Sequence, residues 1–256
     1  MSFDWAELLR LPEATMAGGL NIPKTMLVKN GELTKSDQRR LSNVLHLKYA
    51  ASLKHGNTRI PPVVNGEYDA QSVLILACEL KTTASAPAEV MQVIHKVFPN
   101  PTVVCAETSD GRIGISVGLK RRSQSEAGEF VVESIRNSSF FSPDDERYEP
   151  YLSRIQFPNL SQQDLLSLVR KLASDTERAR VIPVLGFYPA CGERDTETLM
   201  RLVREVSARQ VKIEGLRARW RAKGVSLAES AKLRVQMRDM QREIDEYHDE
   251  IQRLCR

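Results

Sequence analysis

The sequence predicts an α+β fold, in which a mostly antiparallel sheet with flanking helices is followed by a C-terminal antiparallel coiled-coil helical hairpin. Three observations support this prediction. Residues 58–136 contain short apolar runs bounded by turn residues, which is the pattern of strands. One stretch of helical spacing, residues 86–97, interrupts these runs. After residue 196 the apolar positions recur every three or four residues over two long stretches, as in a coiled-coil seam.

The composition is that of a folded protein. Of the 256 residues, 41% are apolar and 27% are charged, which excludes a disordered or collagen-like chain. The longest strongly apolar run, Val73–Cys78, is far shorter than the roughly 20 residues of a membrane-spanning helix. The first ten residues include acids and lack the apolar stretch of a signal peptide. We therefore expect a cytoplasmic protein with no membrane partner.

The N-terminal part predicts an arm and then a helix. Residues 21–31 are expected to form a short edge strand or an extended arm, because Pro23 cannot donate a hydrogen bond to a central ladder. Thr34 and Asp37 have the spacing of a capping box, which marks the start of a helix. Apolar residues at helical spacing continue from there to Leu53. We expect one long helix over this whole stretch.

The predicted sheet follows that helix. Its runs are TRIPPVV, SVLILACELK, TVVCAET, RIGISVGLKR and EFVVESI. The pair Asp110-Gly111 between the third and fourth runs is the strongest hairpin signal in the chain. Ala86–Val97, between the second and third runs, is expected to be a helix that Pro99 closes. The order is therefore strand, helix, strand, hairpin strand, strand.

Residues 196–256 predict the helical hairpin. Gly224 separates two helical stretches, and Ser226 with Glu229 forms a capping box for the second. A short turn between two helices with matched seams indicates an antiparallel pair, with arms of about 40 Å at about 1.5 Å per residue. The expected seam consists of Leu199, Leu202, Val206, Ile213, Leu216 and Trp220 in the first helix, and Leu233, Met237, Met240, Ile244, Tyr247, Ile251 and Leu254 in the second.

We expect three parts in the chain: an α+β body at residues 1–136, a connecting segment at 137–195 that packs on the body or links it to the hairpin, and the hairpin at 196–256. Within the connecting segment, Ser161 is expected to cap a helix that ends at Leu172. The run RVIPVLGFYP is expected to be a short strand or an extended segment, because it is apolar and contains prolines.

The positive charge is concentrated in the hairpin. The formal charge of the chain is +4, which is too small by itself to indicate a polyanionic partner. Residues 1–195 contain equal numbers of basic and acidic residues, 23 of each. Residues 196–256 contain 14 basic and 10 acidic residues, so this segment carries the whole excess.

The basic residues of the hairpin crowd around its turn and around Trp220. Such a cluster neutralises phosphates, and an exposed tryptophan stacks on a base. Alternatively, Trp220 closes the seam while the arginines keep the hairpin in solution, or the cluster docks on an acidic protein. A basic strand end at residues 120–122 extends a basic surface or protects a sheet edge. The candidate binding residues are Arg209, Lys212, Arg217, Arg219, Trp220, Arg221, Lys223, Lys120, Arg121 and Arg122.

A second candidate site contains Asp69, Glu79 and Lys81. Glu-Leu-Lys ends an apolar strand, and an acid lies ten residues before it. This pattern is similar to that of metal-dependent nucleases of the restriction-endonuclease type, in which two carboxylates bind Mg²⁺ and the lysine positions water. The alternative is that Glu79 and Lys81 mark the point where a buried strand reaches water. A Mg²⁺-dependent nuclease is therefore the alternative to a non-enzymatic function.

Other common sites have no counterpart in the sequence. The cysteines Cys78, Cys105, Cys191 and Cys255 are scattered and have no CxxC pair, so that a zinc site is not expected. The four histidines lack the spacing of a catalytic triad or a metal site, and no phosphate-binding loop or nucleophile elbow is present. We expect no cofactor and no bound metal.

The order of several motifs resembles that of a bacterial family of domains of unknown function. The motifs are FDW near the start, IPK, a strand that ends in ELKT, the segment VFPNPTVVCAE, then LKRRS and AGEFVVES, and finally the charged hairpin. They span nearly the whole chain. One departure concerns the start of the second hairpin helix, GVSLAESA, which is nearly neutral where the family tends to be polar and basic.

The resemblance implies an accessory protein encoded beside restriction-type helicases and DNA methyltransferases, and it implies no catalytic residues. We therefore expect a non-enzymatic adaptor subunit in an antiviral restriction-modification complex, with a helicase or a methyltransferase as its partner. DNA is the further expected partner, at the hairpin tip. A homo-oligomeric scaffold, in which two hairpins form a four-helix bundle, is a third interpretation.

Overall fold

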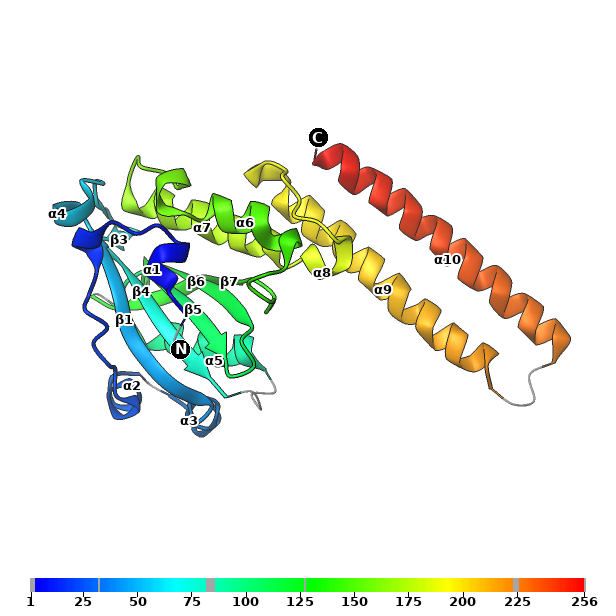
Figure 1. Ribbon diagram of the computed structural model, residues 1–256, viewed down its shortest axis with the longest axis horizontal. Coiled ribbons are helices and arrows are strands. Elements are labelled where there is room, and N and C mark those ends of the chain that lie inside the picture. Colours follow the sequence, from blue (N-terminus) through cyan, green and yellow to red (C-terminus); the bar gives the residue numbers. More distant parts are fainter. Residues whose placement is uncertain (1–2, 32, 82–85, 127, 223–225, 256) are drawn as a thin grey trace. The chain divides into compact units, whose positions relative to one another are not determined.

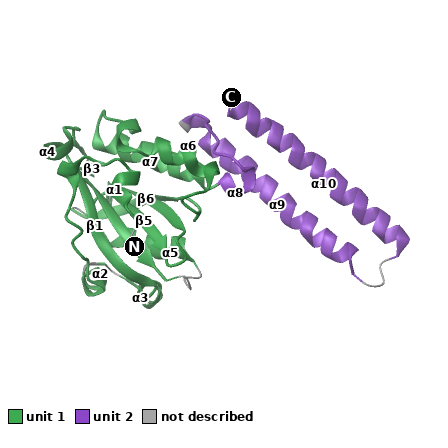
Figure 2. Cartoon of the chain, in the orientation of Figure 1, with its two compact units in different colours: residues 1–180 green, residues 181–256 purple. Residues whose placement is uncertain are grey.

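The computed structural model describes residues 3–31, 33–81, 86–126, 128–222 and 226–255. The chain divides into two compact units, Met1–Arg180 and Val181–Arg256, which Figure 2 shows in different colours. The first unit extends beyond the expected body at 1–136, because a helix of the expected connecting segment packs on the sheet. No helix among the described residues has both the length and the apolar character needed to cross a membrane.

A five-stranded mixed sheet forms the centre of the first unit (Figure 1). Its strand order is β1-β4-β5-β6-β7, and β4 and β5 run parallel while the other neighbouring strands run antiparallel. The predicted α+β class and the mostly antiparallel sheet are thereby confirmed. The strands are β1 (Val44–Lys54), β4 (Ser72–Leu80), β5 (Thr102–Thr108), β6 (Ile113–Arg122) and β7 (Phe130–Asn137), with a separate pair of β2 (Val63–Val64) and β3 (Asp69–Ala70).

The helices of the chain are short in the first unit and long in the hairpin. Most of the short ones begin or end at a proline or a polar cap, as expected where the chain turns. The α-helices are α1 (Trp5–Leu8), α2 (Lys24–Asn30), α3 (Lys35–Leu41), α4 (His55–Thr58), α5 (Pro87–Val97), α6 (Glu149–Arg154), α7 (Leu165–Ala179), α8 (Ile182–Leu185), α9 (Thr196–Trp220) and α10 (Leu227–Leu254), and the 3₁₀ helices are η1 (Glu13–Thr15), η2 (Glu146–Tyr148), η3 (Phe157–Asn159) and η4 (Glu193–Asp195).

The expected long helix after Thr34 is wrong beyond Leu41. The capping box of Thr34 and Asp37 is present and starts α3, but residues 44–54 form strand β1 and pair with β4. Two register shifts in this pairing make the buried positions Val44, Leu47 and Ala51 recur three and four residues apart. A strand with bulges therefore produced a pattern that is typical of a helix.

The expected arm at residues 21–31 is also mostly wrong. Asn21 forms an isolated bridge with Lys48 and the Ile22 N–H donates to Leu47 O, so the arm begins as expected. From Lys24 onward, however, the chain is helix α2. Pro23 lies at the N-cap of this helix, where its missing N–H costs nothing because a helix start has no intrahelical acceptor for it.

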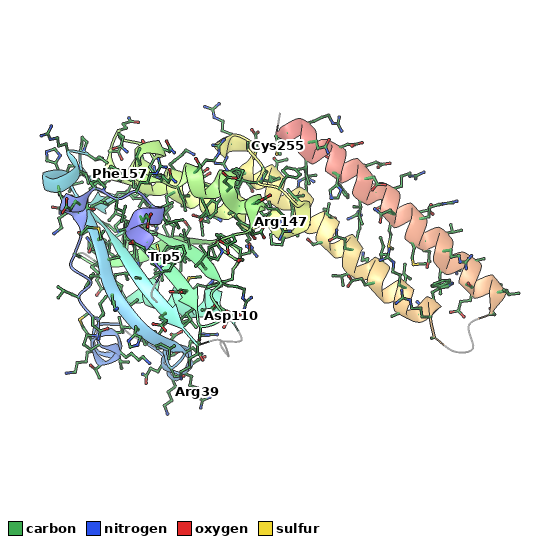
Figure 3. The ribbon with its side chains drawn as sticks, viewed as in Figure 1. Trp5, Arg39, Asp110, Arg147, Phe157 and Cys255 are labelled. Atoms are coloured by element: carbon green, nitrogen blue, oxygen red, sulfur yellow. The ribbon has the colours of Figure 1, made fainter. Side chains whose placement is uncertain are left out.

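The crossover helix and the hairpin in the sheet are confirmed. Helix α5 begins at Pro87 and connects β4 to β5, which requires a crossover because these strands are parallel. Its buried side chains Met91 and Ile94 pack with Leu76 and Val104 on one face of the sheet. Asp110 and Gly111, with Gly111 at φ +81°, form the turn between β5 and β6 (Figure 3).

Helix α7 covers the sheet beside β6 and β7. Because the residues of β6 from Ile113 to Gly118 are all buried, both faces of that strand are covered. The expected helix from Ser161 to Leu172 is shifted, since Asp164 caps α7 by accepting the Ser167 N–H, and the helix continues to Ala179.

The second unit contains α8, α9 and α10. The expected extended segment at 180–189 is wrong, because Ile182–Leu185 is a helical turn that ends at Gly186 with φ +80°. The antiparallel contact between α9 and α10 buries a seam close to the expected one. Its fully buried members are Leu199, Leu202, Val206, Ile213, Leu233, Ile244 and Ile251, and Leu216, Trp220, Met237, Met240, Tyr247 and Leu254 are half-buried.

A buried histidine joins α5 to β6. The His95 Nε2 lies 2.8 Å from Ser116 Oγ, and the Lys120 ammonium donates to the His95 carbonyl oxygen. Gly118 lies under the imidazole, where a Cβ atom would come within 2.5 Å of the His95 Nδ1. Burial, with a contribution from the Lys120 charge, lowers the pKa of His95 to about 3. The packing therefore requires a neutral imidazole.

We predict that acid destabilises the first unit through His95. The unfolded chain takes up a proton near pH 6.5, whereas the folded chain does so only near its lowered pKa of about 3. The contribution of the neutral His95 to the free energy of unfolding is therefore fully present above pH 6.5. It falls as the pH drops, by about 2 kcal/mol between pH 7 and pH 5. Urea unfolding followed by Trp5 fluorescence in a Trp220→Phe background measures this loss. In the same background, His95→Gln should lack about 2 kcal/mol of the pH dependence, and an unchanged dependence would contradict the prediction.

Candidate functional site

The hairpin has a basic end and an acidic end. We define the distal hairpin as residues 207–222 of α9 and its C-cap together with residues 226–238 at the start of α10. It carries eight basic and two acidic side chains, whereas residues 239–255 carry six acidic and two basic ones. The positive charge identified in the sequence is therefore concentrated at one end of the hairpin. The expected turn residues Lys223 and Gly224 lie outside the described residues.

The side chain of Arg209 makes its contacts within the hairpin. Its guanidinium lies 2.5 Å from Glu243 on α10 and 2.5 Å from Glu205 on α9. It also lies over the Tyr247 ring, 4.7 Å from the ring centre. Hydrogen bonds to the two glutamates raise the pKa of Arg209 above its ordinary value. The structure thus makes Arg209 a polar link between the two helices, and this removes it from the expected phosphate-binding set.

Trp220 also serves the hairpin. Its indole N–H donates to Ser230 Oγ at 2.7 Å, and the Arg234 guanidinium lies 5.1 Å from the centre of its ring. The side chain is half-buried. Arg219 forms a longer ion pair of 3.5 Å with Glu229. Of the two interpretations of Trp220, these contacts favour closure of the seam over an exposed platform for bases.

Several distal cations are exposed and have no acidic partner among the described residues. Three of them, Lys212, Arg217 and Arg221, belong to the expected set. Two others, Lys232 and Arg234 on α10, were not predicted from the sequence, because the start of that helix is nearly neutral. The sequence signal that could have identified them is the run KLRVQMR, in which the basic residues lie next to the apolar seam residues.

The basic strand end at 120–122 does not form an exposed patch. Lys120 is 5% exposed, and burial lowers its pKa to about 8. Arg122 pairs with Asp69 at 3.0 Å, and Arg121 donates to the Arg122 carbonyl oxygen. The expectation that Lys120 extends a basic surface is therefore wrong, because its ammonium points into the unit and donates to a backbone carbonyl.

The predicted acidic site is divided by the structure. Asp69 lies in β3, before β4 begins, whereas Glu79 lies near the other end of β4. The seven steps from Ser72 to Glu79 along the strand span about 23 Å at about 3.3 Å per residue. Lys81 follows the strand and is exposed. Asp69 and Glu79 cannot share a metal ion in this structure, so the grouping of these two acids is wrong.

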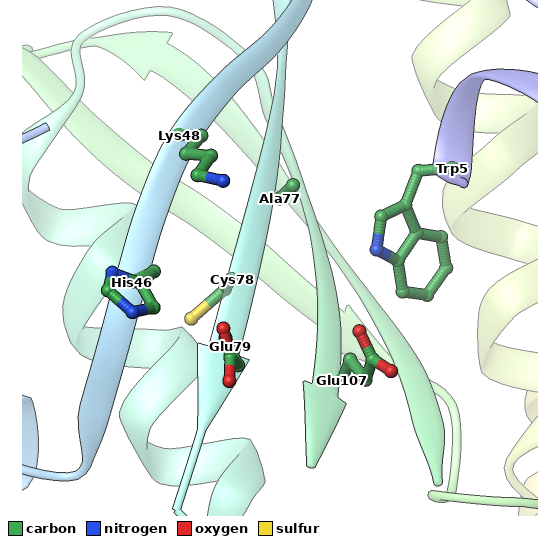
Figure 4. A pocket seen from close by; sticks show the side chains of 7 residues that line it. All are labelled: Trp5, His46, Lys48, Ala77, Cys78, Glu79 and Glu107. Atoms are coloured by element: carbon green, nitrogen blue, oxygen red, sulfur yellow. The ribbon is translucent and has the colours of Figure 1, made fainter. Parts of the chain in front are cut away.

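Glu79 instead lies beside a different acid. Its neighbour across the parallel pairing is Glu107 of β5, and its neighbour across the antiparallel pairing is His46 of β1. These side chains, with Lys48 and Trp5, line a shallow pocket that is partly open to solvent (Figure 4).

The two glutamates are half-buried and are not part of an ion pair among the described residues. The Phe3 N–H donates to Glu107 at 2.9 Å and is the one bond to either carboxylate that the described residues show. Two adjacent carboxylates suit a cation, but no group of three or more His, Cys, Asp or Glu in the described part of the chain is arranged to hold a metal. A Mg²⁺ ion at this place would have two protein ligands and would need water for its remaining ligands.

A comparison with protein families places most of the chain in a known family. The model of the family described as "Domain of unknown function (DUF4391)" matches residues 9–244, which is most of the chain. The chain belongs to this family. The match covers the sheet, α5, α7 and most of the hairpin, in agreement with the resemblance in the sequence motifs. No curated protein and no solved structure matches the chain.

We predict that Ser230→Ala weakens the distal hairpin. The change leaves the half-buried Trp220 N–H without its acceptor, which costs about 1 kcal/mol. Backbone amides of α9 and α10 in the distal hairpin should exchange with deuterium about fivefold faster, as mass spectrometry of peptides would show. Ser207→Ala is the control, since the Ser207 hydroxyl only bonds the carbonyl of Val203 in its own helix. Equal exchange in both variants would contradict the prediction.

Proposed function

We propose that this protein is a non-enzymatic accessory subunit of a DNA-processing, restriction-modification-like complex. The first unit docks on a partner helicase or DNA methyltransferase, and the distal hairpin contacts DNA. One observation carries the DNA contact: five exposed cations that have no acidic partner among the described residues, Lys212, Arg217, Arg221, Lys232 and Arg234, gather in the distal hairpin. The partner enzymes are the ones that the motif resemblance implies, and the match to a family of unknown function is compatible with them.

The charge distribution supports a contact that is limited to one end of the hairpin. Duplex DNA carries one negative charge per about 1.7 Å of its axis. Lys212, Arg217 and Arg221 attract this charge, while residues 239–255, with six acids, repel it. DNA would therefore be held at the distal end and kept away from the rest of α10.

The same distribution is compatible with a second copy of this chain, whose acidic residues 239–255 would complement the distal hairpin. The exposed face of α10 offers little apolar area for a bundle, since Val235 is its one exposed large apolar residue beyond the helix start. Light scattering of the pure protein distinguishes the contact with DNA from a homo-oligomeric scaffold, because a scaffold requires a stable oligomer without DNA.

The prediction for this function is a loss of DNA binding when the distal charge is reversed. Replacing Arg217, Arg219, Arg221 and Lys223 by Glu should reduce DNA binding at least 100-fold, because attraction to phosphates becomes repulsion. Electrophoretic mobility shift with duplex and single-stranded DNA at low and moderate salt measures the change. Circular dichroism checks that the variant keeps its helices. Equal binding by the variant and the wild type, or no binding by either, would defeat the DNA contact.

A second candidate function is metal-dependent phosphodiester hydrolysis in the pocket. The observation that favours it is the adjacent, unpaired pair of Glu79 and Glu107, with Lys48 and His46 on the neighbouring strand. The two glutamates would hold Mg²⁺, and Lys48 would pair with the phosphate. The metal would supply an activated water. This proposal keeps the nuclease class of the sequence analysis but replaces Asp69 by Glu107 and Lys81 by Lys48.

Plasmid cleavage in Mg²⁺ or Mn²⁺ tests this candidate. Glu79→Gln and Glu107→Gln should each lower cleavage at least 100-fold, because each removes a charged ligand and keeps the shape. Asp69→Asn is the matched control, since this acid is paired with Arg122 away from the pocket. Cleavage that survives both glutamine variants would assign the activity elsewhere. No cleavage by the wild type in either metal would exclude the nuclease.

A further inference from the structure

We infer that the distal hairpin binds the phosphates of duplex DNA without reading its bases, and that Lys232 and Arg234 of α10 are part of this surface. The inference rests on the proposed contact with DNA and specifies its chemistry. Lys232 and Arg234 are not among the binding residues expected from the sequence. Trp220 and Arg209 do not belong to this surface.

The described residues of the distal hairpin include no exposed aromatic ring on which a base could stack. Proteins that prefer single strands stack the bases on exposed aromatic rings. Trp220 is the only aromatic residue in the sequence of the distal hairpin. Its N–H is bonded to Ser230, and Arg234 lies over its ring. A base could stack there only if these contacts were broken, so the hairpin offers no ready platform for single-stranded DNA.

The paired helices of the hairpin are too wide for the grooves of duplex DNA. Two packed α-helices are about 20 Å across, whereas the major groove is about 12 Å wide. The pair cannot enter the groove side by side, and the contacts Arg209–Glu243 and Trp220–Ser230 hold the two helices together. The cations on the outer surfaces then meet the sugar-phosphate backbone, which carries no direct sequence information.

The exposed cations of α9 and α10 lie at the same level along the hairpin. The pairs Trp220–Ser230 and Arg219–Glu229 set the register of α9 against α10. In this register Lys232 and Arg234 lie opposite residues 216–218 of α9. They therefore fall within the stretch between Lys212 and Arg221, which is about 14 Å long at about 1.5 Å per residue.

A charge density of this kind favours the duplex. Five cations, Lys212, Arg217, Arg221, Lys232 and Arg234, lie within those 14 Å or so and have no acidic partner among the described residues. Duplex DNA presents one charge per about 1.7 Å, and a single strand presents about half that density. If all five contact phosphates, log K falls with log salt with a slope of about −4.5, which is about a 500-fold loss of affinity between 50 and 200 mM salt.

The experiment is fluorescence anisotropy with the full chain at several salt concentrations. The probes are a labelled 20-base-pair duplex in two unrelated sequences and one of its single strands. The test variant is Lys232→Gln with Arg234→Gln. The matched control is Arg204→Gln with Arg253→Gln, which removes the same charge outside the distal hairpin. Trp220→Leu tests stacking, and circular dichroism confirms the helix content of each variant.

We expect the wild type to bind both duplexes equally and at least tenfold tighter than the single strand. The Lys232 and Arg234 variant should lose affinity at 50 mM salt, and its salt dependence should fall to about 40-fold over the same range, because two phosphate contacts are removed. The control pair and Trp220→Leu should remain within about twofold of the wild type.

Three results would overturn the inference while leaving the DNA contact intact: tighter binding of the single strand, a loss of tenfold or more in Trp220→Leu, or wild-type binding by the Lys232 and Arg234 variant. No binding of any probe by the wild type would overturn the proposed function itself, and the inference with it.

Discussion

The first unit depends on the parallel pairing of β4 with β5. Parallel neighbours need a crossover, and α5 supplies it and packs on the same two strands. The alternation of side chains then divides each strand between two faces. Leu76 and Val104 enter the core under α5, while Glu79 and Glu107 are left adjacent on the other face. The pocket is thus a direct result of the pairing that builds the core.

Some of the basic side chains of the hairpin stabilise the hairpin itself. Arg209 is a cation at a seam position, and it is tolerated because Glu205, Glu243 and the Tyr247 ring surround it. Trp220 closes the distal end in a similar way, through Ser230 and Arg234. A count of basic residues therefore overstates what is available to a ligand. The exposed, unpaired cations are fewer, and they come from both helices.

Much of the fold could be predicted because local signals agreed with the tertiary structure. The hairpin seam, the Asp110-Gly111 turn and the helix that starts at Pro87 all follow from short-range patterns. The prediction for strand β1 was wrong for a physical reason. Bulges in its pairing with β4 give Val44, Leu47 and Ala51 a helical spacing. A bulge is set by the partner strand and leaves no clear mark in the strand's own sequence.

The sequence alone determined the α+β class, the coiled-coil hairpin and the concentration of positive charge around its turn, because these depend on periodicity and composition. Only the tertiary structure decided which charges are available and which acids meet. Asp69 and Glu79 are close in sequence but separated by the length of β4, whereas Glu107 is distant in sequence and adjacent in the sheet. The reason is that strand pairing and helix contacts bring together residues that the linear order of the chain keeps apart.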